Sequence, residues 1–119
     1  MDDLDGDDES LVQEARIVVR QLAEPQIGTD GRILEWNDEF IEEDPLHRHL
    51  SHLYELHPGT GITARSSRLE NAARKSLETR GDDGSGWSIV WRMIMWARLR
   101  DAEHAERIIG MFLRPVDAD

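Results

Sequence analysis

The segment that decides the fold is WSIVWRMIMWARL, residues Trp87–Leu99, in which only Ser88, Arg92 and Arg98 are polar. Apolar side chains recur at helical spacing on one face and also occupy much of the opposite face. A helix that is apolar nearly all round must be covered on more than one side. The segment therefore predicts an inner helix packed between other helices.

Amphipathic segments flank this inner helix, and the chain as a whole predicts about five helices. They are residues 9–23, 44–56, 67–81, 87–99 and 101–113. Asp44-Pro45 can start the second, with Asp44 as N-cap and the proline in the first turn. Ser67 and Glu70 can form a capping box for the third, and Gly81 can end it. No stretch alternates with a period of two, so the predicted class is all-α.

A buried helix between amphipathic ones is expected in a two-layer helical toroid, where outer helices wrap inner ones. Residues 11–114 would form part of such a domain, between an acidic disordered start at 1–10 and a short tail at 115–119. About five helices make less than half of the ring. We therefore expect that the chain dimerises, that further segments complete it, or that it exposes a large apolar patch.

Composition excludes several classes of protein. The 119 residues carry a net charge of -11 and contain no cysteine. Disulfides and thiolate chemistry are therefore excluded, and an acidic surface argues against a nucleic-acid partner. No signal peptide and no stretch of membrane-spanning length is present, which predicts a cytoplasmic protein without a membrane partner. Lys75 is the only lysine, so arginine dominates the cations, as in salt-adapted proteins or GC-rich genomes.

Residues suited to binding a sugar lie in two places. Glu35 and Trp36 occupy a long loop, residues 24–46, and loops of this length are usually functional. Arg48 and His49 belong to the run His47–Tyr54. Aromatic faces stack on the C–H patches of neutral sugars, and forked or planar donors reach hydroxyls. Loop packing of the tryptophan, or a hydrogen-bonded helix start at 48–49, would explain the same residues.

Four blocks of sequence occur in an order that resembles a known family. They are Pro25–Gly28 with Asp30–Trp36, His47–Tyr54 with Leu56–Gly59, Arg80–Asp82 with Ser85–Ser88, and Trp91–Leu99. Together they are similar to glycoside hydrolase family 95, the α-L-fucosidase-type enzymes, whose catalytic domain is an (α/α)6 barrel. The resemblance runs from about Leu11 to Leu113. It implies that this chain is a partial barrel.

The resemblance also implies which residues meet the substrate. Arg48 and His49 match positions that line the sugar pocket, and Glu35, Trp36 and Trp87 are the further substrate-binding candidates. The implied substrate is an α-L-fucoside or an α-galactoside, and no cofactor is implied. A metal site at the nearby imidazoles of 47, 49 and 52 is disfavoured because no carboxylate accompanies them. Asp82 and Asp83 are expected to form a turn before the following helix, with Ser85 as its N-cap.

Catalysis by this chain alone is not expected. The resemblance implies an inverting mechanism, which needs a general acid and a group that activates water on opposite sugar faces. In the family the glutamate acid and the water-positioning asparagines precede the His-Arg-His block, and the assisting aspartate follows in Asp-Gly-Asn-Phe-Gly. No carboxylate of this chain matches these positions. The sequence predicts a fragment of such an enzyme, with a sugar-binding remnant or a small helical interaction module as alternatives.

Overall fold

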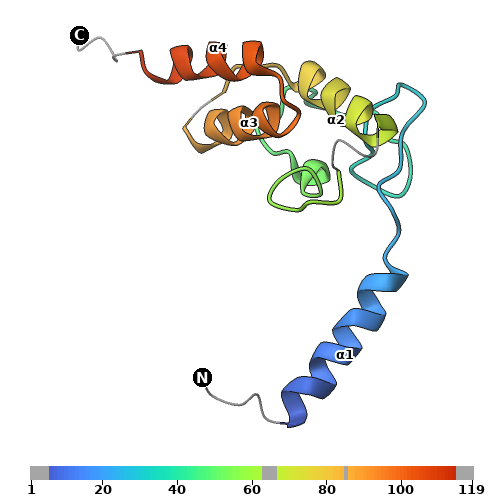
Figure 1. Cartoon of the computed structure of the whole chain (residues 1–119). Coiled ribbons are helices and arrows are strands. Elements are labelled where there is room, and N and C mark those ends of the chain that lie inside the picture. The colour runs from blue at the N-terminus through green and yellow to red at the C-terminus, as the bar shows by residue number, and fades with distance from the viewer. Residues whose placement is uncertain (1–5, 63–66, 85, 115–119) are drawn as a thin grey trace.

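The computed structural model of the chain describes residues 6–62, 67–84 and 86–114. Its helices are α1 (Gly6–Gln21), α2 (Ser67–Arg80), α3 (Trp87–Arg98) and α4 (Ala102–Phe112), with the short 3-10 turn η1 (Ser51–Leu53). The described residues contain no strand, only an isolated antiparallel bridge between Ile27 and Ile33. The predicted all-α class is confirmed. α1 stands apart, while α2, α3, α4 and η1 gather into one body (Figure 1).

The prediction of a helix at residues 44–56 was wrong. Asp44 instead makes a turn, in which its Oδ1 accepts the N–H of Leu46 and its carbonyl oxygen accepts the N–H of His47, both at 3.1 Å. The chain then runs irregularly to Leu50. Leu53 N–H donates to Leu50 O and Leu56 N–H to Leu53 O, both at 2.9 Å. These bonds span three residues, which is 3-10 rather than α geometry.

Helix boundaries follow local chemistry with some differences from expectation. Gly81 ends α2 with a φ of +70°, as predicted, because glycine tolerates this left-handed conformation. Ser67 is already the first helical residue, so it is not the N-cap of α2. Gly86 is the N-cap of α3, and the expected cap at residue 85 lies outside the described residues. α1 begins at Gly6, so it includes residues 6–10 of the segment expected to be disordered.

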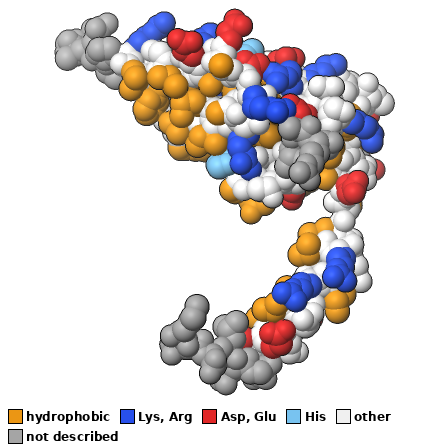
Figure 2. All heavy atoms as spheres, in the orientation of Figure 1, with side chains coloured by type: hydrophobic (Ala, Val, Ile, Leu, Met, Phe, Trp, Pro, Cys, Tyr) orange, Lys and Arg blue, Asp and Glu red, His pale blue; other side chains and the backbone are white. Residues whose placement is uncertain are grey.

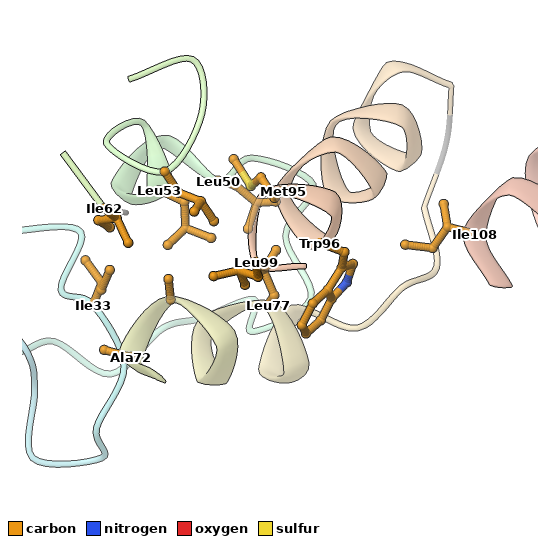
Figure 3. Packing of buried hydrophobic residues seen from close by; sticks show 12 residues of the cluster. Ile33, Leu50, Leu53, Ile62, Ala72, Leu77, Met95, Trp96, Leu99 and Ile108 are labelled. Carbon is orange, nitrogen blue, oxygen red and sulfur yellow. The ribbon is translucent and has the colours of Figure 1, made fainter. Parts of the chain in front are cut away.

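The core of the body lies between α2, α3, α4 and the η1 region. Trp96 is completely buried, and Figure 3 shows it between Leu77 and Leu99 on one side and Ile108 on the other. Its ring stacks on that of His104, with centroids 4.0 Å apart, and its Nε1–H donates to Asp82 Oδ1 at 2.9 Å. The remaining buried apolar side chains are Ile33, Leu50, Leu53, Leu56, Ile62, Ala72, Ala73 and Met95.

Apolar surface remains uncovered on three helices. On α3 a shallow apolar hollow is lined by Val90, Trp91 and Ile94 together with Trp87 and the His57-Pro58 segment. Hydrophobic side chains gather over the α3–α4 side in Figure 2. At the end of α4 and just after it, Ile109, Phe112 and Leu113 are exposed. Residues 8–21 of α1 are exposed all round. No helix of the described residues is long and apolar enough to cross a membrane.

Candidate functional site

The five sequence-predicted binding residues fall into two neighbouring groups. Arg48, His49 and Trp87 come together where the irregular segment before η1 meets the start of α3. Glu35 and Trp36 lie in the long loop that leads from the Ile27–Ile33 bridge. All five side chains belong to exposed residues, so a soluble ligand can reach them.

The first group is a row of aromatic rings. The rings of His47 and His49 stack with their centroids 4.9 Å apart. His49 then meets Trp87 edge-on at 5.3 Å, and Trp87 tilts against Trp91 at 5.9 Å. Trp87 remains 51% exposed and offers an indole face to a ligand. Such a face suits the C–H side of a sugar ring, while the imidazoles can exchange hydrogen bonds with hydroxyls.

Arg48 lies beside this row. Its Nε donates to His49 Nε2 at 3.4 Å, and it has no ion pair among the described residues. The side chain also lines a second, open hollow with Arg80, Arg92 and the Gly81–Gly84 turn. Its guanidinium is therefore available to hydroxyl groups of a ligand.

The second group is fixed by a buried cation. Arg80 is nearly completely buried at the end of α2, and its Nη2 lies 3.6 Å from Glu35 Oε2. The same guanidinium donates to both carboxylate oxygens of Glu42, at 3.2 and 3.1 Å. It also donates to the carbonyl oxygens of Asp44 and Pro45, at 3.1 and 3.0 Å. One arginine therefore ties the long loop and the turn that follows it to α2.

His52 is the second buried polar group at this place. Its side chain is only 4% exposed, and its Nδ1 lies 3.9 Å from Glu35 Oε2 without a hydrogen-bond partner. Burial lowers the pKa of His52 to about 4, and the positive charge of Arg80 acts in the same direction. The imidazole is therefore neutral at pH 7.

Trp36 takes no part in these contacts. It is 66% exposed and lines a hollow with Phe40, Ile41 and the acidic residues of the same loop. The two groups are connected through Arg80, which contacts Glu35 and also lines the hollow that Arg48 borders. Arg80 therefore lies between Glu35 and the hollow that Arg48 borders, while Trp36 lines a separate hollow.

Other acidic residues have structural partners. Asp82 accepts the indole N–H of Trp96 and also binds the guanidinium of Arg107, so it joins the α2–α3 turn to α4. Asp83 Oδ1 accepts the N–H of Gly84 at 2.8 Å, as expected of a turn residue. No group of three or more His, Asp or Glu side chains among the described residues could hold a metal ion.

Sequence reasoning missed the three buried polar residues below the surface. In the sequence, Arg80 belongs to a block that carries the family resemblance, and Arg92 is one of the few polar residues of an apolar helix. A signal was present, because a charged side chain inside an otherwise apolar helix requires polar partners when it is buried. His52 follows the buried Leu50 by two residues and precedes Leu53 directly, and nothing in that spacing indicates burial.

Comparison with known proteins decides the family. The family model described as the glycosyl hydrolase family 95 catalytic domain matches residues 1–118. The chain belongs to glycoside hydrolase family 95. It is 37% identical over 110 residues to a protein from Arabidopsis thaliana named alpha-L-fucosidase 2, and 31% identical over 109 residues to the probable alpha-fucosidase A of Aspergillus niger.

The matched region is a small part of these relatives. The aligned residues cover 92% of this chain but 13% of the Arabidopsis protein, and 84% of this chain but 14% of the Aspergillus niger protein. A second probable alpha-fucosidase A, from Aspergillus oryzae, is 36% identical over 91 residues. The family 95 catalytic domain is an α/α toroid, so the four α-helices described here fit part of one. The expected count of about five was one too high because residues 44–56 form turns.

Proposed function

We propose that this chain supplies one wall of the sugar pocket of a family 95 glycosidase whose substrate is an α-L-fucoside. The observation that carries the proposal is the row His49–Trp87 with Arg48 beside it, which places an exposed indole, an imidazole and an exposed guanidinium together. The names of the relatives support the choice of a fucoside over an α-galactoside.

Each side chain has a role in this proposal. Trp87 stacks on the apolar side of the sugar ring, and His49 and Arg48 donate hydrogen bonds to its hydroxyls. Glu35, held between Arg80 and His52, accepts hydrogen bonds from sugar hydroxyls at the edge of the pocket. Trp36 packs against a more distant part of the ligand.

The proposed role is binding without catalysis. Inverting hydrolysis needs two carboxyl-type groups about 6.5–9.5 Å apart on opposite sides of the scissile bond. Beside the Arg48–His49–Trp87 row, Asp82 is committed to Trp96 and Arg107, and Asp83 lies in a turn. Glu35 is committed to a guanidinium. We propose that the general acid and the water-activating residues belong to other segments of the enzyme.

A second candidate function rests on the uncovered apolar faces. α1 and the hollow beside Trp91 are what a helical interaction module would present to a partner. The same faces would be covered by the remaining segments of a toroid. A sugar-binding test separates the two functions, because an interaction module has no reason to recognise L-fucose.

The test is an amide and side-chain NMR titration of the full chain with L-fucose. We expect shifts at the indole N–H of Trp87 and at the His49 ring, and weaker binding in Arg48→Met. Arg16→Met on the exposed α1 is the matched control and should bind like the unmodified chain. A dispersed spectrum in which L-fucose moves no signal at Arg48, His49 or Trp87 would contradict the proposal.

A further inference from the structure

Arg92 is a fully buried cation with an unusual set of partners. It lies on the second turn of α3, whose other buried residues are Ser88, Met95 and Trp96. Its pKa is lowered, mainly by burial and also by the charge of Arg80. No carboxylate lies within ion-pair distance of Arg92 among the described residues, and its Nε has no hydrogen-bond partner. A buried charge without a counter-ion costs free energy, so its presence calls for a reason.

The guanidinium binds two backbone carbonyl groups from different segments. Nη1 donates to the carbonyl oxygen of Asp83, in the turn between α2 and α3. Nη2 reaches the carbonyl oxygen of His47 at 3.5 Å, 45 residues away in sequence. Arg92 therefore connects the segment that bears Arg48 and His49 to the helix that bears Trp87.

The backbone is shaped to admit this side chain. A Cβ added to Gly84 would lie 2.6 Å from Arg92 Nη1 and 2.8 Å from Ser88 Oγ, closer than real side chains pack. The guanidinium thus occupies the space that a larger residue at 84 would need. Gly84 allows the turn to approach Arg92 closely enough for the carbonyl of Asp83 to be bound.

We infer that Arg92 is a positioning residue, which holds the His47–His49 segment against Trp87 so that the binding row is formed before a sugar arrives. The inference rests on the proposed function and deepens it. Arg92 is buried, and its two terminal nitrogens donate to backbone oxygens, so it acts on the ligand through the segment that it holds. Preorganisation of this kind raises affinity by removing the cost of ordering the segment on binding.

The test compares Arg92→Met, Arg92→Lys and Gly84→Ala with the unmodified full chain. Two quantities are measured by NMR: the ring-proton shifts of His49, which sense the nearby indole, and the dissociation constant for L-fucose. In Arg92→Met we expect the His49 shifts to move toward those of a free histidine and the dissociation constant to rise about tenfold. Arg92→Lys keeps the positive charge but lacks the forked donors of a guanidinium. Its His49 shifts and its dissociation constant should lie between those of the unmodified chain and those of Arg92→Met.

Gly84→Ala leaves Arg92 in place and displaces its guanidinium, so it should change both quantities in the same direction. Gly110→Ala is the matched control, because a Cβ there meets nothing within 4 Å, and it should change neither. The Trp36 indole signal serves as an internal reference that should stay constant in every variant. If Arg92→Met does not fold, the result for Gly84→Ala decides whether Arg92 has a positioning role.

Folded variants that keep the His49 shifts and the L-fucose affinity of the unmodified chain would overturn the inference. Should the unmodified chain fail to bind L-fucose, the proposed function fails, and the His49 shifts alone decide the role of Arg92. Displaced shifts would then still support a positioning role, and unchanged shifts would refute it. The two ideas can therefore fail separately.

Discussion

α1 and α3 are both rich in apolar residues, yet only α3 lies in a folded environment. α1 stands apart from the other helices in Figure 1, and its Leu11, Val18 and Val19 are exposed, whereas Met95 and Trp96 on α3 are completely buried. An apolar stripe indicates that a face needs covering, but it does not specify what covers it. The difference between the two helices lies in the availability of partners within this chain.

The largest effect should follow from removing the centre of the body. Trp96→Ala deletes a buried indole, its stacking on His104 and its hydrogen bond to Asp82. We expect a loss of about 3–5 kcal/mol in the free energy of unfolding, a large part of what a small domain has. Urea denaturation followed by near-UV circular dichroism measures it. Trp36→Ala, at a 66% exposed position, should cost less than about 0.5 kcal/mol. Equal losses would refute the assignment of the core.

Breaking the ion pairs of Arg80 should cause the next largest loss in the free energy of unfolding. Arg80→Met leaves the carboxylates of Glu35 and Glu42 without their buried partner, which costs about 3 kcal/mol. Thermal unfolding in low salt is a suitable measurement. Arg100→Met is the control, because Arg100 is exposed and lies 3.6 Å from Glu70, and a surface pair contributes about 0–1 kcal/mol. A stable Arg80→Met protein would show that the loop carrying Glu35 does not depend on this cation.

Acid should destabilise the body formed by α2, α3, α4 and η1 through protonation of His52. The pKa of His52 is lowered to about 4 in the folded state, mainly by burial, against 6.5 in the unfolded chain. Between these values the unfolded chain binds more protons, so stability falls as the pH drops from about 6.5 to 4. The full effect is of the order of 3 kcal/mol. Unfolding curves across this range test it.

His52→Leu removes the titrating group and should flatten the pH dependence between 4 and 6.5. Asp30 and Asp101 contribute at lower pH, because hydrogen bonds from Arg32 and from His104 with Arg74 lower their pKa values below 3.8. A slope that persists unchanged in His52→Leu would assign the acid sensitivity to another group.

The smallest effect should come from α1. Leu11→Ala should change the free energy of unfolding by less than about 0.5 kcal/mol, while Leu77→Ala in the core should cost about 2–5 kcal/mol. An isolated helix of 16 residues is marginal in water. Hydrogen exchange should therefore show weak protection of α1 amides and strong protection in α3. Similar protection in both helices would mean that α1 finds a partner in solution.

Sequence patterns predicted helices wherever long-range contacts were not needed to choose the conformation. Gly81 and the periodic apolar residues of α2 and α4 sufficed for those helices. The sequence patterns failed at residues 44–56, where the buried side chains of Leu50, Leu53 and Leu56 are spaced three residues apart. That spacing matches a series of 3-10 turns, and Asp44 forms a local turn instead of starting a helix.

The candidate site was predictable only at its surface. The motif blocks named His49 and Trp87, whose rings lie 5.3 Å apart, and their role in binding a sugar stays a prediction. Arg80, Arg92 and His52 could not be assigned in the same way, because their importance depends on burial and on carbonyl groups distant in sequence. Hydropathy treats such residues as surface residues, whereas Arg80 and Arg92 are buried and donate to backbone carbonyl groups.

The uncovered face of α1 also bears on the fate of the chain in a cell. An exposed amphipathic helix on a short linker is a preferred target of chaperones and proteases, which act on segments that open easily. Abundance of the protein should therefore be limited by how quickly that face is covered, and not by how firmly Trp96 is packed.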